Sequence, residues 1–273
     1  MTYTAGIDIG STYTKALILD EERAIVGQSM RPTGFKLDTV SQTVLHEALD
    51  RAGLQRGDVA YVVATGFGRH QASDADTSVT DLTAAARGVT HLFPNTRTIL
   101  DVGGQTMKAS RLENGWKVKS FRLNDKCAAG TGAFLEKTAR YMGYTTLEIG
   151  PLVTTSKEAI PISGVCAVFA ESEVINHLSQ GVSPADIMHG AMVSLVGRSV
   201  QLMKRVRMEP EYTLVGGILR FEKMKEAVEE QIGAGVNVPP PDQVQFSAAL
   251  GAALLGFQRV GHKSAGAAPG ATV

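Results

Sequence analysis

The chain contains little cysteine, no excess of charge of one sign and no long apolar run. Its two cysteines, Cys127 and Cys166, are too few for a secreted scaffold held together by disulfides. The 27 basic residues balance 27 acidic ones, which excludes the strongly basic surface typical of nucleic-acid-binding proteins. The longest weakly polar stretch, residues 246–257, is too short to span a bilayer, and the N-terminal residues lack the pattern of a signal peptide. We therefore expect a cytoplasmic protein that binds neither nucleic acid nor membranes.

Glycine, in contrast, is abundant, with 29 of 273 residues, and several glycines follow predicted strands. One such pattern occurs twice. A strand ending in Asp8-Ile9-Gly10 is followed by Lys15, and a strand ending in Asp101-Val102-Gly103 is followed by Lys108. The two aspartates lie 101 − 8 = 93 residues apart. This repetition of a strand, a small-residue turn and a second strand predicts two lobes of related fold that face one another.

Strands and helices alternate along the chain, which predicts an α/β protein. We expect the first lobe to cover residues 1–95 and the second to cover residues 96–260, with the last helix able to return to the first lobe. Residues 261–273 are expected to form a flexible tail. The expected strands are 3–9, 13–19, 59–64, 99–102 and 212–215, and the expected helices are 39–52, 81–89, 133–142, 167–178, 184–206, 221–231 and 246–256.

The turns between the paired strands are candidate phosphate sites. A turn of small residues points several backbone N–H groups toward one place, which favours an anion. Asp8 and Asp101, at the strand ends, are candidate catalytic carboxylates that suit Mg²⁺ beside phosphate, and Gln105 is a candidate for orienting the attacking water. The pair Gly216-Gly217 allows close approach of an adenosine. The candidate nucleotide-binding residues are Gly10, Ser11, Thr12, Tyr13, Thr14, Lys15, Gly103, Gly104, Gln105, Gly130, Thr131, Gly132, Gly216 and Gly217.

These turns resemble those of the superfamily of acetate kinase, sugar kinases, heat-shock chaperones and actin. Two further segments, NDKCAAGTG at residues 124–132 and VCAVFAESEV at residues 165–174, resemble one branch of it. That branch contains the activators of 2-hydroxyacyl-CoA dehydratases and the ATPase subunits of benzoyl-CoA reductase. The resemblance covers about residues 3–260. It implies an actin-like, ribonuclease H-like fold with two lobes, a duplicated mixed-sheet domain and a nucleotide cleft between the lobes.

The two cysteines have two interpretations. Their spacing alone fits small buried residues, because they form no Cys-x-x-Cys pair. The family resemblance implies instead that Cys127 and Cys166 are ligands of a [4Fe–4S] cluster. Such a cluster needs four ligands, so two chains, supplying 2 × 2 = 4 thiolates, would share it across a dimer interface.

The resemblance also implies a function in electron transfer. It implies an ATPase that binds Mg²⁺ with ATP or ADP and couples hydrolysis to low-potential electron transfer toward an acyl-CoA reductase or dehydratase. The implied partners are a related ATPase subunit, acyl-CoA-binding reductase subunits and a ferredoxin-type electron donor.

Two departures from the pattern of the dehydratase activators bear on the choice within this branch. Thr106 follows the second turn, and residues 218–221 follow Gly217, where the activators usually have other residues. Both departures favour the smaller ATPase subunit of benzoyl-CoA reductase, in a heterodimer and in anaerobic aromatic degradation, over a homodimeric dehydratase activator. The remaining alternatives are a small-molecule kinase of the same superfamily and a nucleotide-binding subunit without turnover.

Overall fold

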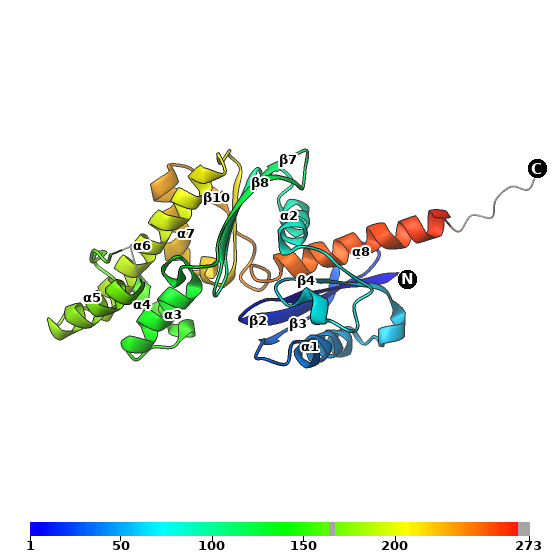
Figure 1. The fold of residues 1–273 in the computed structure, drawn as a ribbon, viewed down its shortest axis with the longest axis horizontal. Helices are drawn as coiled ribbons and strands as arrows, with labels where there is room; N and C mark the ends of the chain where they lie inside the picture. The colour runs from blue at the N-terminus through cyan, green and yellow to red at the C-terminus, as the bar shows by residue number, and fades with distance from the viewer. Residues whose placement is uncertain (164–166, 267–273) are drawn as a thin grey trace, which may run out of the picture. The chain divides into compact units, whose positions relative to one another are not determined.

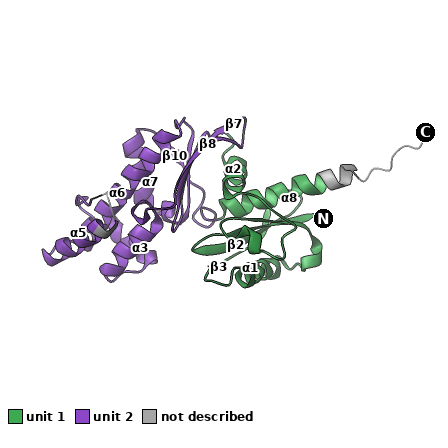
Figure 2. Cartoon of the chain, viewed as in Figure 1, with its two compact units in different colours: residues 1–94, 246–273 green, residues 95–245 purple. Residues whose placement is uncertain are grey.

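The computed structural model describes residues 1–163 and 167–266, which divide into two compact units (Figures 1 and 2). Unit 1 contains residues 1–94 and the chain from residue 246 onward, and unit 2 contains residues 95–245 (Figure 2). The chain therefore leaves the first unit once and returns to it with its last helix. In the described part of the chain, no helix has both the length and the apolar character needed to cross a membrane.

Unit 1 is built on a five-stranded mixed sheet with the strand order β3-β2-β1-β4-β5. The first three strands in this order are antiparallel to one another, whereas β4 runs parallel to β1 and β5 parallel to β4. The strands are β1 (Tyr3–Ile9), β2 (Tyr13–Leu19), β3 (Ile25–Pro32), β4 (Val59–Thr65) and β5 (Thr77–Ser78).

Helices cover both faces of this sheet. Side chains alternate along β2, so that Ile18 packs toward α1 (Leu37–Ala52) while Leu17 and Leu19 pack toward α8 (Ser247–Gly266). Helix α2 (Asp81–Leu92) packs against α8. Each face of the sheet thus buries its own apolar cluster, which is why the strands read as nearly continuous hydrophobic runs.

Helix α8 approaches its neighbours more closely than side chains usually allow. A Cβ added at Gly251 would lie 1.7 Å from the Ala84 carbonyl oxygen of α2, so only glycine fits there. The helix is also longer than the sequence predicts. It continues to Gly266, beyond the expected end at residue 256. The flexible tail expected for residues 261–273 stays a prediction. Residues 267–273 lie outside the described residues.

Unit 2 repeats the sheet of unit 1. Its strand order β8-β7-β6-β9-β10 matches β3-β2-β1-β4-β5, with the same antiparallel and parallel neighbours. The strands are β6 (Thr98–Val102), β7 (Met107–Glu113), β8 (Lys117–Asn124), β9 (Tyr212–Val215) and β10 (Val236–Asn237). The correspondence makes β6 and β7 the equivalents of β1 and β2.

The helices of unit 2 share one large apolar core with its sheet. Helix α6 runs through this core and carries twelve buried residues, including Ile187 and Met203. The helices are α3 (Gly132–Tyr141), α4 (Ile149–Thr154), α5 (Ala167–Ser179), α6 (Pro184–Arg205) and α7 (Glu222–Ile232).

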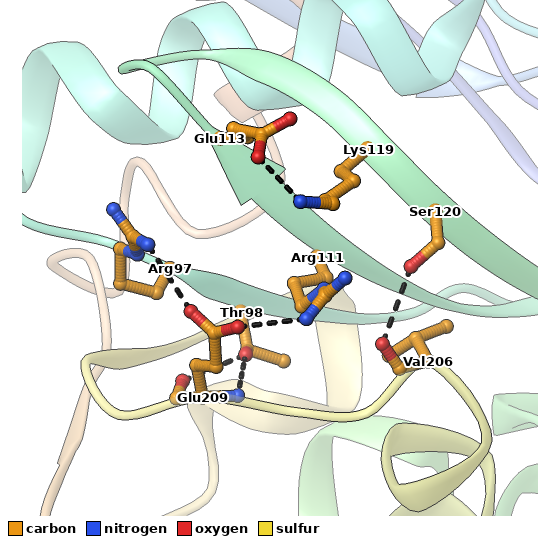
Figure 3. Close-up of polar contacts among 8 residues, drawn as sticks. All are labelled: Arg97, Thr98, Arg111, Glu113, Lys119, Ser120, Val206 and Glu209. Carbon is orange, nitrogen blue, oxygen red and sulfur yellow. Dashed lines mark hydrogen bonds and ion pairs between the residues drawn. The ribbon is translucent and has the colours of Figure 1, made fainter.

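A polar network fastens the connection between α6 and β9 to the sheet (Figure 3). Glu209 accepts hydrogen bonds from Arg97 at 3.1 Å and from Arg111 at 2.7 Å, and the Thr98 hydroxyl donates to the Glu209 carbonyl oxygen at 2.7 Å. The hydrogen bond from Arg97 is the main reason why the pKa of Glu209 lies below its usual value. The network fixes the position of the first residue of β9, and therefore also the position of its last residue, Val215.

Candidate functional site

The first turn, residues 10–13, joins β1 to β2 and lies beside an ion pair. Asp8 and Lys15 face each other across the two strands, with 2.9 Å between Lys15 Nζ and Asp8 Oδ2. The side chains of Lys15 and Asp8 are largely buried, at 13% and 11% exposure. The Gly10 N–H donates to the Tyr13 carbonyl oxygen at 3.1 Å and closes the turn. A carboxylate, an ammonium group and a glycine turn are thus brought together at one strand end.

The remaining residues of this predicted phosphate site differ in the exposure of their side chains. Ser11 is exposed and Thr12 is partly exposed, so both can reach a ligand. Thr14 is fully buried, and its hydroxyl shares a hydrogen bond of 3.0 Å with Thr33. Thr33 also donates to the Gly10 carbonyl oxygen at 2.8 Å. Thr14 therefore supports the turn through Thr33.

The second turn, residues 103–106, repeats this arrangement in unit 2. Asp101 and Lys108 face each other across β6 and β7, with 3.6 Å between Lys108 Nζ and Asp101 Oδ2. The Gly103 N–H donates to the Thr106 carbonyl oxygen at 2.8 Å, as Gly10 does to Tyr13 in the first turn. The side chain of Gln105 is exposed at the tip. The duplication seen in the sequence is therefore a duplication of hydrogen bonds and ion pairs.

One glycine beside each turn adopts a positive φ that favours glycine. Gly66 follows β4 with φ +89°, and a Cβ there would lie 2.5 Å from Asp8 Oδ1. Gly216 follows β9 with φ +107°, and a Cβ there would lie 2.2 Å from the Val102 carbonyl oxygen. Gly216 is among the residues predicted to lie near the ligand, whereas Gly66 is not. The repeat itself could have identified Gly66, because both glycines directly follow the strand parallel to the aspartate-bearing strand.

The predicted ligand residues Gly130, Thr131 and Gly132 lie under the second turn and are buried. The backbone N–H groups of Gly132 and Ala133 donate to the carbonyl oxygens of Gly103 and Gly104, at 2.9 and 2.7 Å. The first N–H groups of α3 are thereby used to hold the turn. Direct contact of these three residues with a nucleotide stays a prediction.

Cys127 lies at the end of the loop after β8, and its side chain is partly exposed. Asn124 holds its backbone from both sides, accepting from the Cys127 N–H at 3.2 Å and donating to the Cys127 carbonyl oxygen at 3.1 Å. Arg198 Nη1, from α6, lies 3.3 Å from Cys127 Sγ. No sequence pattern indicates Arg198, because it is 71 residues away and lies within an ordinary amphipathic helix.

Cys166 lies outside the described residues, but the segment that leads toward it is described up to Ser163. This segment is fixed to α6 by Asp186, whose carboxylate accepts from the backbone N–H of Lys157 at 2.7 Å and from the Ser156 hydroxyl at 2.9 Å. The backbone hydrogen bond from Lys157 is the main cause that lowers the pKa of Asp186. Helix α6 therefore contacts the loop that carries Cys127 and the segment at residues 156–158 that precedes Cys166 in the sequence.

Similarity to known proteins decides the family. The model of the BadF/BadG/BcrA/BcrD ATPase family matches residues 5–256. The chain belongs to this ATPase family. It is 40% identical over 255 residues to the 2-hydroxyisocaproyl-CoA dehydratase activator of Clostridioides difficile, covering 93% of this chain and 95% of that protein. It is 34% identical over 268 residues to a benzoyl-CoA reductase subunit of Thauera aromatica, covering 95% of this chain and 94% of that protein.

A solved structure agrees with this assignment. The activator of the 2-hydroxyisocaproyl-CoA dehydratase from Clostridium difficile, solved with bound ADPNP, superposes with a TM-score of 0.92 at 38% identity, covering 99% of this chain and 100% of that chain. The predicted family and the predicted actin-like ATPase fold are therefore confirmed. The higher identity to the activator than to the reductase subunit favours the dehydratase activator over the smaller ATPase subunit of benzoyl-CoA reductase, which was expected from Thr106 and residues 218–221.

Proposed function

We propose that this chain is the ATP-hydrolysing activator of a 2-hydroxyacyl-CoA dehydratase. The matched pair of turns carries the proposal, since each turn places an Asp–Lys ion pair beside a glycine turn in a member of this ATPase family. The 40% identity to a dehydratase activator supports the choice of substrate class. Benzoyl-CoA reductase, whose subunit has the lower identity, is the second candidate.

In this proposal the two turns bind Mg²⁺-ATP. Backbone N–H groups of the exposed turn residues receive the phosphates. Asp8 and Asp101 would hold Mg²⁺, which would supply positive charge beside the phosphates. Lys15 and Lys108 pair with these two carboxylates. Gln105 orients the water that attacks the terminal phosphorus, which yields ADP and inorganic phosphate. The exposure of Gln105 supports this role because a buried side chain could not contact the water.

Two chains would hold one [4Fe–4S] cluster between them, and each chain would contribute Cys127 and Cys166. One chain would supply two thiolates and a [4Fe–4S] cluster needs four ligands, so a second copy would supply the other two. The partly exposed Cys127 and the cationic Arg198 beside it suit a thiolate ligand. When bound, the cluster supplies one-electron transfer at low potential. The acceptor would be an acyl-CoA-binding partner enzyme.

The test uses protein purified without oxygen. We expect about four irons and four sulfides per dimer, Mg²⁺-dependent ATP hydrolysis, and ATP-dependent activation of 2-hydroxyisocaproyl-CoA dehydratase in preference to benzoyl-CoA reductase. Gln105→Ala should lower the hydrolysis rate ~100-fold, the scale expected when a reacting group loses its orientation. Gln201→Ala, an exposed glutamine on α6, serves as the matched control. Equal rates in the two variants would remove Gln105 from the mechanism, and activation of the reductase alone would reverse the choice of partner.

A further inference from the structure

The guanidinium of Arg198 is placed against the sulfur of Cys127 by the core of unit 2. Arg198 lies in the C-terminal half of α6, whose neighbouring residues Ser199 and Val200 are buried. Ser199 is fixed in turn, since its hydroxyl donates to the Leu195 carbonyl oxygen at 3.0 Å. The backbone from which Arg198 projects is therefore held on its buried side, and the side chain reaches Cys127 Sγ at 3.3 Å.

In the described part of the chain, no acidic side chain neutralises the positive charge of Arg198. Within the described ranges its side chain forms no ion pair with an acidic residue, and its Nε is buried without a hydrogen-bond partner. Arg87 and Arg111 also have a buried Nε without a partner, so the feature that sets Arg198 apart is the contact of its Nη1 with Cys127 Sγ. The thiol of Cys127 is the acceptor toward which this arginine is directed.

We propose that Arg198 is a positioning residue of the iron–sulfur centre, donating an N–H to Cys127 Sγ and placing a positive charge beside it. This inference rests on the proposed function, because it takes Cys127 as a ligand. A cluster becomes more negative by one charge when it accepts an electron. A nearby cation stabilises the reduced form more than the oxidised form, and hydrogen bonds to the sulfurs act in the same direction. Arg198 therefore raises the reduction potential of the cluster and makes its reduction by an electron donor more favourable.

The experiment compares Arg198→Met, Arg198→Gln and Arg198→Lys in the full-length protein purified without oxygen. Arg205→Met, an exposed arginine on the same helix, is the matched control. The readouts are the midpoint potential, from a redox titration followed by electron paramagnetic resonance, and the half-life of iron loss to a chelator. Neither readout depends on ATP hydrolysis or on a partner enzyme.

We expect Arg198→Met to shift the ratio of reduced to oxidised cluster about tenfold toward the oxidised form, which is about 59 mV for a one-electron couple. It should also shorten the half-life of iron. Arg198→Gln keeps a donor without the charge and should shift the potential in the same direction, whereas Arg198→Lys keeps the charge and should stay near the unmodified protein. Arg205→Met should change neither readout.

The possible results separate this inference from the proposed function. If the unmodified protein holds no iron, the proposed function fails and this inference fails with it. If the unmodified protein holds iron and Arg198→Met matches it in both readouts, only the role of Arg198 is rejected. If Arg198→Met cannot be loaded, the pair Arg198→Gln and Arg198→Lys decides: a lower potential in the glutamine variant supports the role, and equal potentials reject it.

Discussion

Replacing Gly216 by alanine tests whether the end of β9 is built for close approach of a ligand. Gly216 has φ +107° and ψ 156°, a region that is costly for any side chain, and an added Cβ would lie 2.2 Å from the Val102 carbonyl oxygen. Gly233 provides a matched control, since it also has positive φ, at +69°, but an added Cβ there meets nothing within 4 Å. The two substitutions thus share a positive φ and differ in the steric clash.

The difference can be worked from these geometries. Gly233→Ala should cost ~1–2 kcal/mol of unfolding free energy, for its left-handed backbone alone. Gly216→Ala should cost ~1–3 kcal/mol for its backbone, with about the same again for overpacking against β6. At ~2–4 °C per kcal/mol for a protein of this size, Gly216→Ala should melt roughly 5–10 °C below Gly233→Ala.

The assay is thermal unfolding with and without ADPNP and Mg²⁺. Saturating nucleotide at about 100 times its Kd should raise the stability of Gly233→Ala by about 2.7 kcal/mol. Gly216→Ala should gain much less, because the displaced strand end moves the residues proposed to contact adenosine. Equal melting temperatures and equal nucleotide-dependent gains in the two variants would refute the reasoning.

Two further predictions concern stability. Gly251→Ala should lower the unfolding free energy by at least ~1–3 kcal/mol, since α8 must move away from Ala84; Gly261→Ala, on the same helix with open space around it, should instead be neutral or stabilising in the same urea titration. Because the folded-state pKa of Asp186 is depressed, its stabilising contribution is complete above its usual value of 3.8 and is lost as pH falls through the lowered pKa. Asp186→Asn should therefore flatten the acid side of a stability-versus-pH curve, and parallel curves for the two proteins would contradict this.

The elements with strong hydrophobic patterns can be predicted from the sequence, and the weakly patterned ones cannot. The predicted bounds of the β1–β2 hairpin and of α6 agree with the structure within two residues at each end. Strand β8 escapes prediction because most of its residues are exposed and its sequence, KVKSFRLN, carries no clear alternation. Strand β3 escapes it because it contains Gly27 and ends at Pro32, two residues that normally interrupt a strand.

The candidate site divides in the same way. Asp8, Asp101 and the turn glycines are accessible to sequence analysis because they repeat. The contact between Arg198 and Cys127 is not, because it depends on how α6 is oriented in the core. Burial of Thr14 and Thr131 does not follow from local sequence either, since threonine occurs both at exposed turns and beneath them.

The return of the chain to unit 1 through α8 has a consequence for biosynthesis. The sheet of β1, β2 and β4 is translated early, but the helix that covers one of its faces comes after the whole of unit 2. Until α8 has left the ribosome, Leu17 and Leu19 lack the helix that they pack against on that face of the sheet. By then all the strands and helices of unit 2 have been synthesised. Unit 2, although encoded second, is therefore the first that can complete its fold, and the incomplete first unit is the part of the nascent chain that keeps an apolar sheet face exposed longest.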